Sequence, residues 1–204
     1  MIAIMDYGAG NLQSVKKAFD FIGAESVITD NPEIINACDR ILLPGVGSFG
    51  DAMDSMAKSG LVDTVKQNAL SGKPFLGICL GLQLLFEESE ESPGVKGLGI
   101  FKGKIKKFSS DMGLKIPHIG WNSLEIKQKD TLFKNVPENS YVYFVHSYYL
   151  HAEDKNDIAT VTNYGIDFHS AVGKNNIFAT QFHPEKSGDV GLQILRNFAS
   201  MEVK

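Results

Sequence analysis

The first half of the chain alternates short apolar runs with segments whose apolar residues recur every three or four positions. Such runs predict buried strands, and the three-to-four spacing predicts helices that pack on one side. Alternation of the two predicts a parallel sheet with helices on both faces. The predicted strands are Ile2–Met5, Ser26–Thr29, Arg40–Leu43 and Pro74–Ile78, and the predicted helices are Leu12–Ile22, Pro32–Ala37, Asp51–Lys58 and Leu61–Leu70.

The second half is richer in β-forming residues and in turns that contain Gly or Asn, which predicts added antiparallel strands. Ile116–Asn122 contains proline and glycine, so we expect a loop or an edge strand there. A last helix is predicted over about Ser187–Met201. These elements favour a single α/β domain over residues 1–204, with a mixed, mostly parallel sheet. The predicted strands of this half are Gly99–Phe108, Tyr141–Tyr149, Ile158–Asn163, Asp167–Gly173 and Ile177–Phe182.

Composition narrows the class of protein. The chain has 204 residues and a net charge of −4, a balance that does not indicate nucleic acid or an anionic membrane as a partner. No apolar run approaches the ~20 residues of a membrane span, and the N-terminus lacks the basic region of a signal peptide. Two cysteines cannot form a disulfide framework, so we expect a reducing cytoplasm.

The sequence Gly77-Ile78-Cys79-Leu80-Gly81 has the pattern of a nucleophile elbow, in which a tight turn between strand and helix presents the central side chain. Flanking glycines permit the turn, and a helix N-terminus favours a thiolate on Cys79. The backbone N–H of Leu80 would then face the group that Cys79 attacks. The alternative is that Cys79 is a small buried apolar residue.

Two Gly-rich segments follow predicted strands. The glycines at positions 8 and 10, together with Asp30, resemble a dinucleotide-binding fingerprint, but Gln13 stands where its third glycine is needed. The segment Pro44–Gly50 contains G-x-G-x-x-G, which is compatible with phosphate binding or with a turn that holds no ligand. We favour a third interpretation, an oxyanion donor beside the elbow, because the predicted nucleophile gives that donor a purpose.

Two other features have more than one interpretation. Glu87–Gly94 is rich in glutamate, and we expect a solvated loop rather than a metal site because the spacing matches no ligand pattern. Trp121 is the only tryptophan, and it would be either a core residue or an anchor for a partner.

A nucleophilic cysteine needs a base and a group that orients the base. Among the five histidines, His183 stands out because Pro184 keeps it extended. Residues two apart in an extended chain point the same way, so Glu185 would lie beside the imidazole. A carboxylate there fixes the tautomer and stabilises the imidazolium. Cys79, His183 and Glu185 form a complete set, in an order along the chain that argues against an α/β-hydrolase esterase.

The elbow and the sequence His183-Pro184-Glu185 together resemble the class I (triad) glutamine amidotransferase family. The resemblance implies a flavodoxin-like glutaminase fold in which Cys79 attacks the side-chain amide of L-glutamine. A glutamyl thioester and ammonia result, and water then releases glutamate. We expect no cofactor and no metal.

The resemblance also implies roles for other residues. The oxyanion donors would be the backbone N–H groups of Leu80 and of Val46 or Gly47. The groups that hold glutamine would be Gly45, Gln83, Ser147 and Tyr148.

Further motifs resemble one member of the family, which passes ammonia to a separate (β/α)8 cyclase subunit in histidine biosynthesis. They imply a heterodimer with that cyclase, in which Asn11, Trp121 and Asn122 face the partner. The motifs are Asp6–Leu12, Pro44–Phe49, Pro117–Asn122, His146–Tyr149 and Gln181–Ser187.

Three rival interpretations stay open. The same glutaminase could supply ammonia to another acceptor, such as a sugar-modifying synthetase. A cysteine peptidase or other thiol hydrolase would cleave its substrate without glutamine. A non-catalytic scaffold subunit is the third, although a scaffold has no need of a complete triad.

Overall fold

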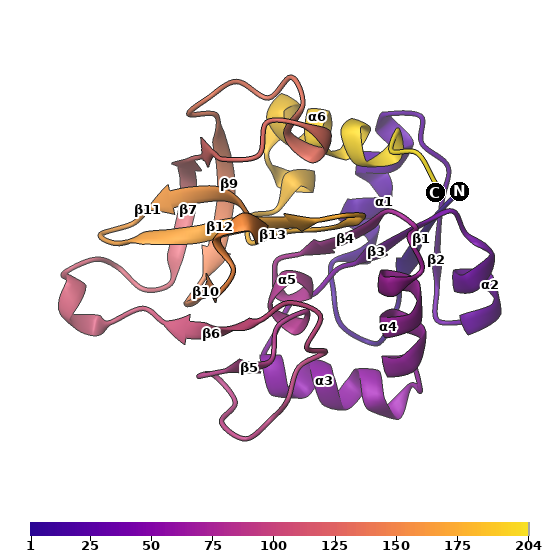
Figure 1. Ribbon diagram of the computed structural model, residues 1–204, viewed down its shortest axis with the longest axis horizontal. Coiled ribbons are helices and arrows are strands. Elements are labelled where there is room, and N and C mark those ends of the chain that lie inside the picture. Colours follow the sequence, from indigo (N-terminus) through magenta and orange to yellow (C-terminus); the bar gives the residue numbers. More distant parts are fainter. Residues whose placement is uncertain (204) are drawn as a thin grey trace.

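Five parallel strands form one half of a central sheet in the computed structural model, which describes residues 1–203 (Figure 1). In sheet order they are β2 (Ser26–Thr29), β1 (Ile2–Met5), β3 (Arg40–Leu43), β4 (Phe75–Ile78) and β13 (Ile177–Thr180). Three of them match the predicted strands residue for residue, whereas β4 begins one residue later and β13 ends two residues earlier. The front half of the fold is therefore the predicted parallel sheet.

The sheet continues beyond β13 in strands that are mostly antiparallel, as predicted for the second half of the chain. One exception is the short β5, which runs parallel to its neighbour β6. Most of these strands extend the sheet to the left in Figure 1. In sheet order they are β12 (Asp167–Lys174), β10 (Tyr148–Ala152), β6 (Gly103–Lys107) and β5 (Glu88–Ser89), with β11 (Ile158–Asn163) and β8 (Glu125–Ile126) attached beside β12.

A separate two-stranded sheet packs beside the large one. It pairs β7 (His118–Ser123) with β9 (Tyr141–His146), antiparallel and in a register that sets Trp121 opposite Tyr143. The segment Ile116–Asn122 is thus the expected edge strand. The predicted strand Tyr141–Tyr149 was wrong in one respect, because it divides at Ser147 and its two parts belong to different sheets.

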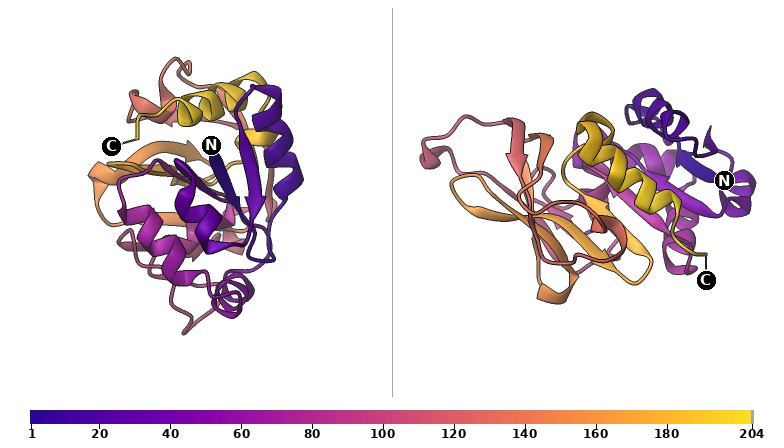
Figure 2. Two further views of the ribbon diagram at one scale, coloured as in Figure 1. Left: turned by 90° about the vertical axis from the view of Figure 1, so that its right-hand side faces the viewer. Right: turned by 90° about the horizontal axis from the view of Figure 1, so that it is seen from above.

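Helices cover both faces of the parallel strands. Seen from above in Figure 2, α1 (Leu12–Phe21) and α6 (Gly188–Ala199) lie over the same face. Alternate residues of β1 serve two cores: Ile4 packs in one with Phe19 and Phe198, and Met5 packs in the other with Met56. The helices that contribute to this second core are α2 (Pro32–Ala37), α3 (Phe49–Lys58), α4 (Val62–Leu70) and α5 (Leu80–Leu84).

The remaining helical segments are short. They are 3-10 turns at Ser110–Met112, Thr131–Phe133, Lys155–Asp157 and Pro184–Lys186. Within residues 1–203, no helix is long and apolar enough to cross a bilayer.

The predicted strand Gly99–Phe108 is shorter in the structure, where β6 covers only Gly103–Lys107. The residues just before β6 instead form hydrogen bonds with the end of α5. The N–H groups of Ile100 and Phe101 both donate to the carbonyl of Leu85, and that of Leu98 donates to Leu84. These bonds satisfy carbonyls that the end of α5 leaves open. The helix after the elbow ends at Leu84.

The acidic segment Glu87–Gly94 is largely exposed, as expected, but three of its carboxylates also bind backbone N–H groups. Glu87 accepts a hydrogen bond from the Gly103 N–H at 3.0 Å, and Glu90 accepts one from the Lys107 N–H at 2.8 Å. The Glu91 carboxylate accepts from the Phe49 N–H at 2.8 Å, at the first turn of α3. Each carboxylate satisfies a backbone donor, so the segment fastens the outer strands to the helical layer.

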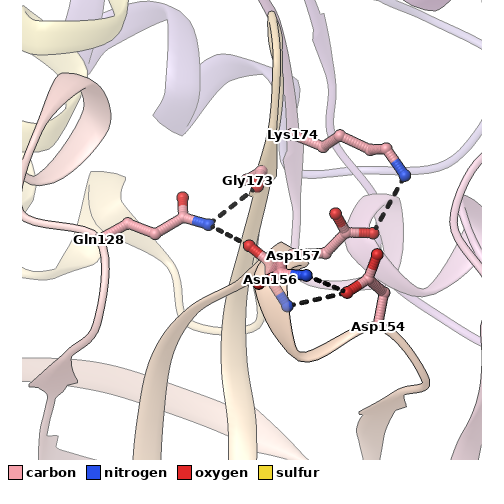
Figure 3. A network of polar contacts seen from close by, with 6 residues as sticks. All are labelled: Gln128, Asp154, Asn156, Asp157, Gly173 and Lys174. Atoms are coloured by element: carbon pink, nitrogen blue, oxygen red, sulfur yellow. Dashed lines mark hydrogen bonds and ion pairs between the residues drawn. The ribbon is translucent and has the colours of Figure 1, made fainter.

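A polar network closes the base of the β11–β12 hairpin (Figure 3). The amide of Gln128 donates to the carbonyl of Asn156 at 2.9 Å and to that of Gly173 at 3.0 Å. A Cβ at Gly173 would lie 2.6 Å from the Gln128 oxygen and 2.9 Å from the ring of Phe178. Beside it, Lys174 and Asp157 form an ion pair at 3.5 Å. The network holds the antiparallel extension in register.

The elbow between β4 and α5 depends on a close approach at Gly81. A Cβ on this buried residue would lie 1.9 Å from the carbonyl oxygen of Leu43, at the end of β3. Only a residue without a side chain lets α5 start so near the sheet. The carboxyl ends of β3 and β4 are thereby brought to one place.

We predict that Gly81→Ala lowers the free energy of unfolding by about 3 kcal/mol, because the methyl group forces α5 away from β3. Urea denaturation followed by circular dichroism measures this. Gly60→Ala is the matched control, since a Cβ there meets nothing within 4 Å although φ is +72°. That control should lose about 1 kcal/mol, and equal losses in the two variants would contradict the prediction.

Candidate active site

Cys79 occupies the strained position of the elbow. Its φ of 55° and ψ of −108° lie in a region that non-glycine residues rarely adopt. The backbone N–H of Cys79 donates to the carbonyl of Thr180 at 2.8 Å, which ties the elbow to β13. The side chain is 8% exposed. Strain of this kind, at a residue that can act as a nucleophile, favours a catalytic role over that of a buried packing residue.

His183 and Glu185 form the predicted imidazole–carboxylate couple. The Nδ1 atom of His183 lies 2.7 Å from Oε1 of Glu185, and both side chains are almost fully buried. The backbone holds the couple in place, because the His183 N–H donates to the Tyr143 carbonyl and the Ser187 hydroxyl donates to the His183 carbonyl. Nδ1 therefore carries the proton, and Nε2 is the atom left for chemistry.

The electrostatics of the couple favour a charged imidazole. Burial lowers the pKa of His183, but interaction with Cys79 and with Glu185 outweighs burial and raises the pKa to about 10. Nε2 makes no hydrogen bond of standard geometry within residues 1–203. Catalytic hydrogen bonds are often long before the substrate binds. His183 is thus an imidazolium, and it borders the same cavity as the Cys79 sulfur.

Cys79 and His183 line one cavity of about 310 Å³, which is large enough for a small ligand. Val46, Gly47 and Leu80 line it too, and their role as oxyanion donors stays a prediction. A larger cavity of about 600 Å³ lies by Pro74 and Phe178, at the opposite end of β4 and β13 from the elbow, and the triad does not border it. The smaller cavity is therefore the candidate site.

The glutamine-binding residues named from the sequence fall partly in this cavity. Gln83, Ser147 and Tyr148 line it. Gly45 is buried beneath it, where a Cβ would lie 2.7 Å from the Tyr7 hydroxyl and 2.8 Å from the Leu80 Cβ. Gly45 thus keeps the loop close to the elbow, and its contact with a ligand stays a prediction.

Tyr7 fastens the Gly-rich loop from below. Its buried hydroxyl donates to the carbonyl of Pro44 at 2.8 Å. Burial, and then the charge of Cys79, raise the pKa of Tyr7, so the hydroxyl keeps its proton and remains a donor. The loop that carries Val46 and Gly47 is therefore held at its first residue.

The phosphate-binding interpretation of this loop is wrong. The N–H of Phe49 already donates to the Glu91 carboxylate, and that of Gly50 donates to the Ser92 hydroxyl at 2.9 Å. The first turn of α3 therefore has its donors occupied, and a carboxylate would repel a phosphate. No group of acidic, histidine or cysteine side chains within residues 1–203 is arranged to hold a metal ion.

Two of the residues expected to face a partner are exposed. Asn11 precedes α1 and is exposed, and Trp121 is 54% exposed on β7, which removes the core interpretation of the tryptophan. Asn122 has contacts within the chain instead: its amide donates to the Asn163 carbonyl at 2.9 Å and lies 3.4 Å from Nε2 of His118. Its contact with a partner stays a prediction.

A family model described as glutamine amidotransferase class-I matches residues 3–201. The chain belongs to the class-I glutamine amidotransferase family. It is therefore a glutamine amidotransferase enzyme, as the elbow and the imidazole–carboxylate couple predicted, and not a peptidase or a scaffold without the activity.

Individual members of the family are similar to this chain over nearly its full length. The chain is 51% identical to the imidazole glycerol phosphate synthase subunit HisH of Methanocaldococcus jannaschii, over 98% of this chain and 100% of that protein. It is 48% identical to the subunit of the same name from Syntrophotalea carbinolica, with the same coverage. A solved structure titled as a glutamine amidotransferase has a TM-score of 0.77 over 98% of this chain at 18% identity, which shows the shared fold.

Three polar residues near the candidate site lie within motifs of the resemblance, but the sequence assigned no role to them. Gln181 is fully buried with its Nε2 atom 3.9 Å from the sulfur of Cys79. His118 and His146 are buried and joined at 2.9 Å between Nδ1 and Nε2. Gln181 and His146 lie beside predicted site residues, but a local pattern does not show that His118 returns to the same place.

We predict that the enzyme loses stability as the pH falls from about 6.5 to about 4. Burial lowers the pKa of His118 to about 4 and that of His146 to about 3. In this pH range the two histidines are therefore protonated in the unfolded chain and neutral in the folded chain. Each ring should cost about 2 kcal/mol at about pH 5. Urea denaturation across this range measures the loss.

The control separates these rings from the other titrating groups. His118→Phe should reduce the pH dependence, whereas His151→Phe, at an exposed histidine, should leave most of it unchanged. An unaltered pH dependence in His118→Phe would show that the buried pair is not its source.

Proposed function

We propose that this chain is the glutaminase subunit of an imidazole glycerol phosphate synthase, which hydrolyses L-glutamine and delivers the ammonia to a cyclase subunit. The proposal rests mainly on one observation: the strained Cys79 and the His183 ring, which is bonded to Glu185, line the same cavity. The near full-length similarity to subunits of that synthase selects this member of the family.

The chemistry follows from the charges of the site. The Cys79 thiolate attacks the side-chain carbonyl carbon of glutamine, and the carbonyl electron pair moves to oxygen. The His183 imidazolium gives its Nε2 proton to the leaving nitrogen, so the collapse of the intermediate releases ammonia and leaves a thioester. His183, now neutral, takes a proton from water, which displaces the thiolate and releases glutamate.

Other groups of the cavity stabilise what these steps create. The tetrahedral oxyanion would accept from the N–H of Leu80 and from an N–H of Val46 or Gly47. Glu185 holds the Nδ1 proton of His183 and stabilises the imidazolium. Gln83, Ser147 and Tyr148 would hold the amino-acid end of glutamine, since all three border the same cavity.

The proposed cyclase surface is the outer face of the small sheet. Ile119, Trp121 and Tyr141 are all more than half exposed there. Trp121 packs edge-on against Tyr143, whose backbone carbonyl accepts the N–H of His183. An apolar partner surface on these residues would thus lie directly beside the catalytic loop, with Asn11 extending the proposed contact.

Contact with a partner is also consistent with the chemistry of ammonia, the product. Free ammonia is protonated in water and is then no longer a nucleophile, so delivery to a second site needs a sequestered path. We place this pair of subunits in the cytoplasm, where the thiol of Cys79 would stay reduced.

The test of the proposed function is glutamate release by the chain alone and with the purified cyclase and its substrate. We expect a low rate alone and a rate at least tenfold higher in the complex. Cys79→Ala should abolish release by more than about a thousandfold, because no other nucleophile is present to form the thioester.

Gel filtration shows whether Cys79→Ala still assembles with the cyclase, which distinguishes a lost nucleophile from a lost fold. A wild-type rate that does not respond to the cyclase would count against this partner. Release that persists in Cys79→Ala would count against the thioester.

We further predict that Trp121→Ala weakens binding of the cyclase by about thirtyfold, because large exposed aromatic anchors contribute about 2 kcal/mol or more to such interfaces. Isothermal titration calorimetry measures the affinity. Leu70→Ala is the matched control: Leu70 is 73% exposed at the end of α4, and its loss should not change the affinity. Equal affinities of Trp121→Ala and the wild type would move the interface elsewhere.

A further inference from the structure

A line of hydrogen bonds runs from β7 toward the nucleophile, and its direction can be assigned. Nδ1 of His146 lies 2.7 Å from the carbonyl oxygen of Tyr148. A carbonyl only accepts, so Nδ1 carries the proton of this ring. In a neutral imidazole the other nitrogen is then an acceptor, and Nε2 of His146 faces His118.

The same logic fixes the second ring. Nδ1 of His118 lies 2.9 Å from Nε2 of His146 and therefore donates to it. Nε2 of His118 is left as an acceptor, with the Asn122 amide nitrogen at 3.4 Å. Both rings are nearly inaccessible to water, at 3% and 6% exposure, and burial keeps the pKa of each well below neutrality. With both rings neutral, only one arrangement of protons satisfies the line.

Beyond the two rings, the line continues through amides to the sulfur. The Tyr148 carbonyl also accepts from Nε2 of Gln83 at 3.4 Å. The same nitrogen donates to Oε1 of Gln181 at 3.1 Å. Because that oxygen is an acceptor here, the amide of Gln181 is turned so that its Nε2 faces the sulfur of Cys79, 3.9 Å away. An N–H aimed at the sulfur stabilises the thiolate.

We propose that His118 and His146 are positioning residues for the nucleophile: the neutral pair holds the Tyr148 carbonyl, which with Gln83 turns the Gln181 N–H onto the Cys79 sulfur. Gln181 is then a catalytic residue, because it touches the reacting atom. The proposal deepens the proposed glutaminase function and rests on it for the reaction, although the state of the sulfur is measured without glutamine.

Packing alone offers a competing account of the two rings. His146 lies among Phe108, Phe144 and Phe168, whose ring centroids are 5.2 to 5.5 Å from the centroid of the His146 ring. If ring shape were all that mattered, His146→Phe would be the mild replacement and His146→Asn the harmful one. The proposed hydrogen-bond relay, from His118 through His146, Tyr148, Gln83 and Gln181 to Cys79, requires the opposite result. His146→Asn should be the mild replacement, because the Asn nitrogen can take the place of Nδ1 and donate to Tyr148, whereas Phe cannot donate.

The experiment measures the thiolate directly, in the full chain with Cys38→Ala so that Cys79 is the only thiol. The probes are the rate of alkylation by iodoacetamide at neutral pH and the ultraviolet absorbance of the thiolate. We expect Gln181→Met to alkylate about tenfold more slowly, since a hydrogen bond to a charged group is lost. His146→Phe should be slowed about fivefold and His146→Asn less than twofold, with matching changes in absorbance.

Thermal unfolding of each variant shows whether it is folded, and Gln181→Met provides the decision if His146→Phe does not fold. Wild-type alkylation in Gln181→Met, or a faster rate in His146→Phe than in His146→Asn, would overturn the relay. Failure of the relay is distinct from failure of the proposed function. The former leaves glutamate release by the wild-type complex intact, and the latter leaves the order of alkylation rates intact while no glutamate is released.

Discussion

The active site depends on one backbone hydrogen bond, from the N–H of Cys79 to the carbonyl of Thr180. It closes the parallel pairing of β4 with β13, two strands that lie about one hundred residues apart in the chain. Cys79 leaves the end of one strand, and Gln181, His183 and Glu185 follow the end of the other. The three candidate catalytic residues therefore meet because two neighbouring parallel strands end at the same edge.

Close packing around the elbow keeps this arrangement rigid. The backbone of Cys79 is strained, and strain of this kind costs on the order of 1–3 kcal/mol. It persists because the surroundings leave no alternative: Gly81 touches the end of β3, and Gly45 is enclosed by Tyr7 and Leu80. The same contacts bring the loop with Val46 and Gly47 and the thiol to one cavity. The geometry of the site thus depends partly on glycines that permit these close contacts.

The parallel half of the fold and the place of Glu185 beside His183 could be predicted because local patterns indicate both. Apolar runs and three-to-four spacing mark the strands and helices, and an extended His-Pro-Glu sets the carboxylate beside the imidazole. The hydrogen bonds of the acidic segment could not be predicted in this way, because its carboxylates bind two N–H groups of β6 and one of α3 that only the folded chain brings near. His118 and His146 are 28 residues apart, and each alone resembles any buried histidine.

The division of the strand at Ser147 also has a physical reason that a residue pattern does not contain. It lets β9 pair with β7 while β10 enters the large sheet, so one segment joins the two sheets. Side chains alternate along β7 and β9, which puts Trp121 and Tyr143 on the outer face and the two histidines on the inner face. A slip of one residue in this pairing would exchange the two sets. The surface proposed for the cyclase and the two histidines of the proposed relay are therefore on opposite faces of the same two strands. One strand register determines both.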